Sequence, residues 1–243
     1  MDCLPGRVDG YLEPFLDSGS VALAVLHEHP DAVVTLASPC TDLVLAWEVA
    51  RDEPEAFIAA VAFHAERHSD PYFRAELEAD PSDPVQRAAR FAYLRGTADL
   101  DEGGRTRSHF AGALPVRGRP ALDPTGIRAL SRLLRQSDVT FEVRGPFETL
   151  RLVREDDLVL LDPPFGRAEA SEREVRSWLN AAVARGASVL APTPGWDGEV
   201  SVDPELYRGW AGMVPVNDRA ADERLWGGGQ LARRLRAERG DRP

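Results

Sequence analysis

The sequence predicts an α/β fold with a mostly parallel sheet, and three observations support this class. Residues 11–37 read as a short apolar strand, a Gly/Ser turn, a helix and a second strand. Such a βαβ unit implies parallel strands joined by a crossover helix. Residues 158–161 form a continuous apolar run, LVLL, as expected for a strand that is buried on both faces. After residue 123, helical and strand patterns alternate.

The order of elements follows from these patterns. After the opening unit, residues 53–68 have a proline near their start and an apolar face, which predicts an amphipathic helix. Residues 69–95 are also helical, with breaks at prolines, and residues 97–120 predict an irregular, Arg-rich hairpin. Later helices are expected at 125–136, 147–151 and 171–185, and later strands at 139–143, 158–161 and from 187.

The regular pattern is therefore interrupted once. We expect one domain formed by residues 1–47 and 123–243, and a helical and hairpin insertion formed by residues 48–122. A chain of 243 residues is long enough to bury a core of this size.

Composition narrows the class of protein. Hydrophobic residues make up 43% and charged residues 28% of the chain, as in soluble globular proteins. There is no apolar run of about 18 residues, which argues against a membrane span. The opening MDCLPGRVDG lacks the apolar segment of a signal peptide, which favours the cytoplasm. Cys3 and Cys40 lack metal-ligand spacing and are expected to be free thiols.

Charge is distributed unevenly along the chain. The net charge is −11, and all 29 cationic residues are arginine. Residues 51–86 contain 9 acids and 3 arginines, whereas residues 87–119 contain 7 arginines and 3 acids. A locally basic segment on an acidic chain fits contacts with phosphates, although a solvated loop is the simpler alternative. The arginines considered for DNA contact are Arg95, Arg105, Arg107, Arg117 and Arg119.

The stretch LVLLDPPFG places a carboxylate where an apolar strand stops. Asp162 follows the strand directly, and Pro163 and Pro164 end it because neither can donate to a ladder. Ligands of open α/β sheets bind outside the carboxyl ends of the strands, so Asp162 and Phe165 lie where a site is expected. A plain strand-stopping turn is the alternative, since Asp and Pro are ordinary turn residues.

Several motifs occur in one order along the chain. They are YLEPFLDSGSVAL, RFAYLRGTADLDEGGRTRSHFAGALPVRGRP, GPFETLRLVREDDLVLLDPPFG and RGASVLAPT. In this order they resemble the Dam-type adenine-specific (N6) DNA methyltransferases along nearly the whole chain. The resemblance implies a Rossmann-like methyltransferase fold and a target-recognition insertion. It also implies site-specific transfer of a methyl group from S-adenosylmethionine to adenine in double-stranded DNA; we expect a monomer.

The resemblance also implies roles for residues. Asp162 and the Pro163 carbonyl would accept hydrogen bonds from the amino group of a flipped adenine, Pro164 would fix the turn, and Phe165 would stack on the base. The family carries a Glu-Pro-Phe-x-Gly-x-Gly turn for the cofactor, and this chain has Asp17 where the family has the first of those glycines. Ser38 stands where the family has an acidic residue. The implied cofactor-binding residues are Glu13, Pro14, Phe15, Asp17, Gly19 and Ser38.

These departures at Asp17 and Ser38 leave two alternatives. One is a degenerate homologue that binds DNA or a partner without catalysis. The other is a transferase of the same fold that acts on an acceptor other than DNA. His64 and His68 stand four residues apart on a predicted helix, which permits a metal site, but no third ligand is evident and a surface pair is the simpler interpretation. No metal is therefore predicted.

Overall fold

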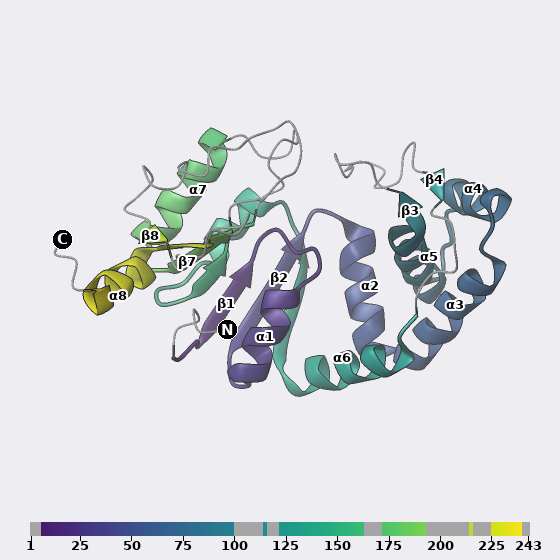
Figure 1. The fold of residues 1–243 in the computed structure, drawn as a ribbon, viewed down its shortest axis with the longest axis horizontal. Helices are drawn as coiled ribbons and strands as arrows, with labels where there is room; N and C mark the ends of the chain where they lie inside the picture. Colours follow the sequence, from purple (N-terminus) through teal and green to yellow (C-terminus); the bar gives the residue numbers. More distant parts are fainter. Residues whose placement is uncertain are drawn as a thin grey trace. The chain divides into compact units, whose positions relative to one another are not determined.

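The computed structural model describes residues 6–99, 114–115, 122–162, 172–192, 214–215 and 225–239. The chain divides into two compact units (Figure 1). The first comprises Met1–Pro39 and Ser137–Pro243, and the second is the continuous segment Cys40–Gln136. The second unit encloses the predicted insertion of residues 48–122, whose role in target recognition stays a prediction.

The first unit is built on a seven-stranded sheet with the order β5-β2-β1-β6-β7-β9-β8. The strands β5, β2, β1, β6 and β7 are parallel, whereas β9 runs antiparallel to β7 and β8. This confirms the predicted α/β class with a mostly parallel sheet. The strands are Gly10–Glu13 (β1), Val33–Ser38 (β2), Asp138–Val143 (β5), Leu158–Leu160 (β6), Ser188–Pro192 (β7), Val214–Pro215 (β8) and Leu225–Gly228 (β9).

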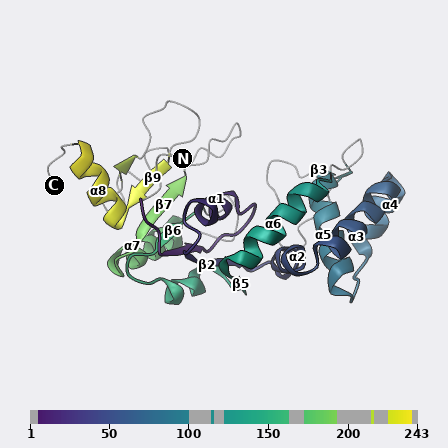
Figure 2. The same cartoon turned by 90° about the horizontal axis from the view of Figure 1, so that it is seen from below.

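Helices cover both faces of this sheet. The helix α1 (Ser20–Glu28) connects β1 to β2, and α7 (Glu172–Ala184) connects β6 to β7. These two connections run in opposite directions across the sheet, and right-handed crossovers then place the helices on opposite faces. Figure 2 shows α1 on one side of the strands and α7 on the other. The 3-10 helix η1 (Pro146–Leu152) precedes β6, and α8 (Gly229–Arg239) follows β9.

The core beneath α7 explains why this helix forms where it does. Its apolar residues recur at spacings of three and four, so one face of the helix is apolar. The indole Nε1 of Trp178 also donates to the Pro146 carbonyl at 3.1 Å, which ties α7 to η1. The buried residues of this cluster are Leu12, Val153, Val159, Leu161, Val175, Trp178, Leu179, Ala182, Ala187, Val189 and Ala191.

The second unit is mainly helical. Proline lies in the first turn of α3, α4 and α5, where its missing N–H costs nothing. Asp83 caps α5 by accepting from the Gln86 N–H at 2.9 Å. The helices are Thr41–Asp52 (α2), Pro54–Arg67 (α3), Asp70–Glu78 (α4), Pro84–Thr97 (α5) and Pro124–Gln136 (α6).

The short strands Ala98–Asp99 (β3) and Leu114–Pro115 (β4) pair antiparallel. This pairing agrees with the predicted hairpin at residues 97–120. Residues 100–113 and 116–121 lie outside the described residues.

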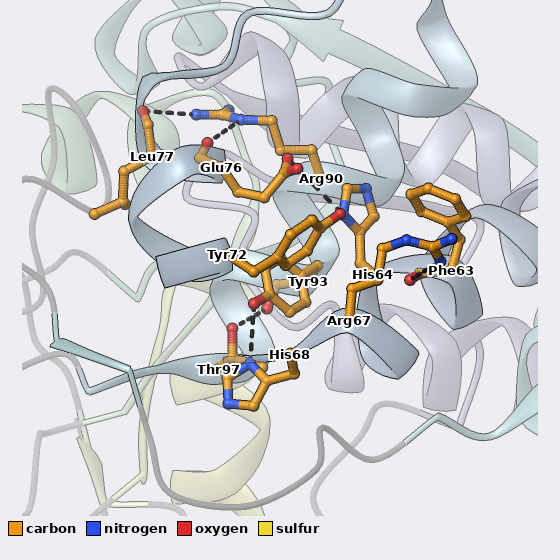
Figure 3. Close-up of polar contacts among 10 residues, drawn as sticks. All are labelled: Phe63, His64, Arg67, His68, Tyr72, Glu76, Leu77, Arg90, Tyr93 and Thr97. Atoms are coloured by element: carbon orange, nitrogen blue, oxygen red, sulfur yellow. Dashed lines mark hydrogen bonds and ion pairs between the residues drawn. The ribbon is translucent and has the colours of Figure 1, made fainter. Parts of the chain in front are cut away.

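A polar cluster of histidine and tyrosine side chains joins α3, α4 and α5 (Figure 3). His64 Nδ1 lies 2.7 Å from the Tyr72 hydroxyl, and His68 Nδ1 lies 2.9 Å from the Tyr93 hydroxyl. The His64 ring also stacks on Tyr93, with ring centroids 5.1 Å apart. The side chain of His64 is buried, with 5% of its surface exposed. The prediction of a surface pair was therefore wrong for His64, because both neighbouring helices contribute tyrosines that cover it.

Candidate functional site

The candidate site lies at the carboxyl ends of β1 and β6, where the strand order of the sheet reverses. The chain runs outward from β1 through β2 to β5 and then returns to β6 on the other side of β1. Open α/β sheets bind their ligands at such a switch point. The last residue of β1 is Glu13, and Asp162 lies two residues beyond the end of β6.

Glu13 is a buried carboxylate at this position. Only 5% of its surface is exposed, and its Oε2 accepts a hydrogen bond from the Tyr11 hydroxyl at 2.8 Å. Burial raises the pKa of Glu13 to about 7, the Tyr11 hydrogen bond lowers it in part, and the negative charges of Asp162 and Asp17 raise it further. Glu13 is therefore held near the balance between its neutral and its charged form at neutral pH.

Asp162 reaches solvent directly from the buried strand. Leu161 is fully buried and its N–H donates to the Leu190 carbonyl at 2.8 Å, so the ladder with β7 continues to this residue. Asp162 itself is exposed. Its charge acts on both Glu13 and Tyr11, which places the three groups close together. Pro163, Pro164 and Phe165 lie outside the described residues.

The turn after β1 leads into α1. Pro14 is buried, and Phe15 packs against the core beneath α7. Gly19 is the N-cap of α1 with φ 62° and ψ 15°, a left-handed conformation that glycine adopts without strain. Gly19 has no side chain with which to cap the helix. The first N–H groups of a helix lack partners within it, so this end of α1 suits an anion.

Two further predicted residues flank the turn. Asp17 is exposed and acts on Glu13 through its charge. Ser38 is the last residue of β2 and is buried, with 5% of its surface exposed. The carbonyl of Ser38 accepts from the Arg144 N–H at 3.0 Å, which joins the end of β2 to the segment after β5. The structure thus places Glu13, Asp17, Ser38 and Asp162 at the same edge of the sheet.

The charges at this edge favour a cationic ligand. The negative charges of Asp162 and Asp17 both act on the Glu13 carboxyl group and raise its pKa. A bound cation would remove that repulsion. In the described part of the chain, no group of three or more His, Cys, Asp or Glu side chains has an arrangement that could hold a metal ion.

The predicted DNA-binding arginines are only partly described. Arg95 is exposed near the end of α5, and its charge acts on Cys40 within the second unit. Arg105, Arg107, Arg117 and Arg119 lie outside the described residues. Their contacts with DNA stay a prediction.

Sequence reasoning assigned no role to Tyr11, although the structure connects it to Glu13. The two residues are separated by one position in a strand, so their side chains lie on the same face. The sequence signal for this contact is a polar aromatic residue two positions before a carboxylate at the end of a strand. It was missed because the strand was interpreted only as an apolar one.

The strand order, with its reversal between β1 and β6, defines the first unit as a Rossmann-like α/β protein. The family model described as D12 class N6 adenine-specific DNA methyltransferase matches residues 1–193, and the chain belongs to this family. It is accordingly a methyltransferase of the class that methylates adenine N6 in DNA, which confirms the resemblance to the Dam type. No curated protein matches the chain. Among the described helices, none has the length and apolar character needed to span a membrane.

Proposed function

We propose that the chain is a site-specific DNA adenine-N6 methyltransferase that uses S-adenosylmethionine, with its reaction centre at the switch point between β1 and β6. The observation that supports this most directly is the parallel pairing of β1 with β6. It brings Glu13, at the end of the strand before the proposed cofactor turn, to the same edge of the sheet as Asp162, which precedes the proposed acceptor loop and acts on Glu13 through its charge.

The residues after β1 fit the cofactor by charge. S-adenosylmethionine carries a sulfonium and an ammonium group, both positive, and Glu13 and Asp17 provide negative charge beside them. Its carboxylate would be held by the N-terminus of α1 behind Gly19, and its ribose hydroxyls by Ser38. Pro14 and Phe15 would shape the turn. Asp17, which replaces a glycine of the family pattern, would then face the ammonium group.

The residues after β6 would hold the adenine. The base must leave the duplex, because its amino group is unreachable inside the stack. Asp162 and the Pro163 carbonyl would accept the two amino hydrogens, which localises the nitrogen lone pair. Pro164 would fix the turn, and Phe165 would stack on the flipped ring. The exposure of Asp162 leaves its oxygens accessible to such a base.

Positioning would account for most of the catalysis. The cofactor, when bound, supplies an electrophilic methyl group: the N6–carbon bond forms while the sulfur–carbon bond breaks. Asp162 would orient the amino group toward that methyl group and stabilise the positive charge that develops on nitrogen. The surplus proton then leaves N6 for solvent, which reaches Asp162.

Double-stranded DNA would be held through its phosphates. Arg95, Arg105, Arg107, Arg117 and Arg119 belong to the segment with a local excess of positive charge on a chain of net charge −11. We propose that the enzyme acts as a monomer in the cytoplasm.

Methyl transfer from labelled S-adenosylmethionine to duplex DNA tests this function. We expect N6-methyladenine from the wild-type chain and a loss of about 100-fold or more in Asp162→Asn, which places a donor where an acceptor is needed. Asp31→Asn is the matched control, because Asp31 is an exposed aspartate just before β2, at the amino ends of the strands. Absence of both cofactor binding and methyl transfer in the wild-type chain would refute the proposal.

A degenerate homologue is the second candidate, and the charge of Asp17 favours it. The Asp17 carboxylate in the proposed cofactor turn would repel the carboxylate of the cofactor, and it raises the pKa of Glu13. This alternative predicts DNA binding without cofactor binding, and a biological activity that survives Asp162→Ala. A transferase with an acceptor other than DNA is distinguished by mass spectrometry, because methylation would appear on another molecule.

A further inference from the structure

Tyr11 is a buried phenol with a defined partner and no part in the function proposed so far. It lies in β1 beside β6, pairs in register with Leu158 and Val34, and has 2% of its surface exposed. Its hydroxyl donates to Glu13 Oε2 at 2.8 Å. Burial raises the pKa of Tyr11 well above its ordinary value of 10, so the hydroxyl remains a donor at every working pH.

Glu13 needs this donor because its surroundings otherwise favour the neutral form. Burial and the charges of Asp162 and Asp17 all oppose its ionisation. Among the described residues, the titratable groups that act on Glu13 are Tyr11 on the same strand, Asp17 in the following turn and Asp162 after β6. Of these, only the hydrogen bond from Tyr11 stabilises the carboxylate.

The hydrogen bond from Tyr11 leaves the Glu13 carboxylate free to bind a ligand through its other acceptor positions. A carboxylate has about four acceptor positions on its two oxygens, and the Tyr11 hydroxyl engages one of them at Oε2. A donor on the same face of the strand also restricts the rotation of the side chain. Glu13 is thereby oriented, and partly charged at neutral pH, before a cation arrives.

We propose that Tyr11 is a positioning residue for cofactor binding, whose hydroxyl keeps the Glu13 carboxylate charged and oriented to receive a positive group of S-adenosylmethionine. This inference rests on the proposed function, because it takes Glu13 as part of the cofactor site. Tyr11 does not touch the cofactor or the adenine and acts only through Glu13.

The proposal predicts a specific pH dependence. Cation binding needs the charged form of Glu13, so cofactor affinity of the wild-type chain should fall as pH falls through about 7. A hydrogen bond to a charged group corresponds to about tenfold or more in an equilibrium constant. In Tyr11→Phe the midpoint of this fall should therefore move up by about one pH unit. The phenylalanine ring keeps the packing of Tyr11.

Calorimetric titration with S-adenosylmethionine between about pH 6 and pH 8.5 is the test. We expect Tyr11→Phe to bind about fivefold more weakly near pH 7, about tenfold more weakly near pH 6, and to approach the wild type at the upper end of the range. The KM for the cofactor should rise by a similar factor, whereas kcat at saturating cofactor should stay within about twofold. Tyr72→Phe is the matched control, since it removes another hydroxyl that is paired inside the protein, in the second unit.

A second variant separates positioning from packing. Glu13→Gln cannot ionise, so its weak binding should lack the part of the pH dependence that comes from Glu13, and adding Tyr11→Phe to it should leave the remaining pH dependence unchanged. Equal pH profiles of wild type and Tyr11→Phe would overturn the inference while leaving the methyltransferase proposal intact. A uniform loss of affinity at all pH values would also overturn it, because that is the effect of disturbed packing. If the wild-type chain does not bind S-adenosylmethionine, both proposals fail.

Discussion

Replacing Glu13 with glutamine should stabilise the folded chain above neutral pH, although the same change should weaken cofactor binding. The side chain is buried beside two other carboxylates, and its pKa in the folded chain is about 7, compared with an ordinary value of 4.5. The folded chain therefore keeps a proton that the unfolded chain has already lost between these two values. Stability falls as pH rises through that window, because ionisation of Glu13 is harder in the folded state.

The size of the effect follows from the two pKa values. Each pH unit between them corresponds to about 1.4 kcal/mol, so the full difference between about 4.5 and about 7 amounts to about 3 kcal/mol in the free energy of unfolding. Glutamine keeps an oxygen that accepts from the Tyr11 hydroxyl, and its amide hydrogens would find acceptors in Asp17 or Asp162. The stability of the Glu13→Gln variant should therefore lack this part of the pH dependence.

Urea unfolding of both proteins near pH 5 and pH 8 measures the effect. Hydrogen exchange of peptides from β1 and β6 limits the observation to the first unit. We expect the stability of Glu13→Gln relative to the wild type to be about 2–3 kcal/mol greater near pH 8 than near pH 5. An equal difference at the two pH values, or a change of opposite sign, would refute the reasoning, because other titrating groups cancel in this comparison.

The remaining predictions concern the stability of single variants and the titration of His64. Gly229→Ala should cost at least about 2 kcal/mol in urea unfolding, because φ is 63° and the added Cβ would overlap the Ala187 carbonyl. Gly96→Ala in α5, with open space around it, should be neutral or stabilising by up to about 1 kcal/mol. An equal cost in both variants would contradict this. Tyr72→Phe should destabilise the second unit by about 1–2 kcal/mol, since His64 Nε2 already has no partner among the described residues and Nδ1 would lose its own. Unchanged urea unfolding would show that this contact contributes nothing. Burial lowers the pKa of His64. The charge of Glu76 raises it in part, and the charges of Arg90 and Arg67 lower it further. NMR titration should find His64 still neutral below its ordinary value of 6.5, and stability should fall as pH drops below that value. An imidazole that titrates at or above 6.5 would exclude this.

The sheet was predictable because its signals are local. The apolar run at residues 158–161 corresponds to β6, and the pattern at residues 11–37 corresponds to β1, α1 and β2. The observed ends of these elements differ from the predicted ones by only a few residues. The turn residue Gly19 and the strand-ending Asp162 stand where the motifs indicate. Such features depend on periodicity and on chain-breaking residues, which a single sequence carries.

Helix α2 shows where this reasoning fails. Residues 41–52 were not assigned to a helix, because the expected insertion began at residue 48 and divided the segment. The helix begins at a cysteine cap, where Cys40 Sγ accepts from the Leu43 N–H at 3.3 Å. Cysteine is not a usual cap, so the start signal was weak. The burial of His64 was missed for a related reason, since its tyrosine partners come from two other helices.

The chemical character of the candidate site depends on contacts that the motifs do not contain. Glu13, before the proposed cofactor turn, and Asp162, before the proposed acceptor loop, belong to separate sequence motifs, but the parallel pairing of β1 and β6 brings them to the same edge of the sheet. The departure from the family pattern at Asp17 adds a third negative charge to the same place and raises the pKa of Glu13. Without a cation this charge favours protonation of Glu13, and with a bound cation it favours binding. Asp17 therefore lowers the stability of the empty site above neutral pH, and it strengthens the binding of a positively charged ligand there. An active cofactor site should show both effects when ligand affinity and stability are measured across that pH range, whereas a degenerate site should show only the loss of stability.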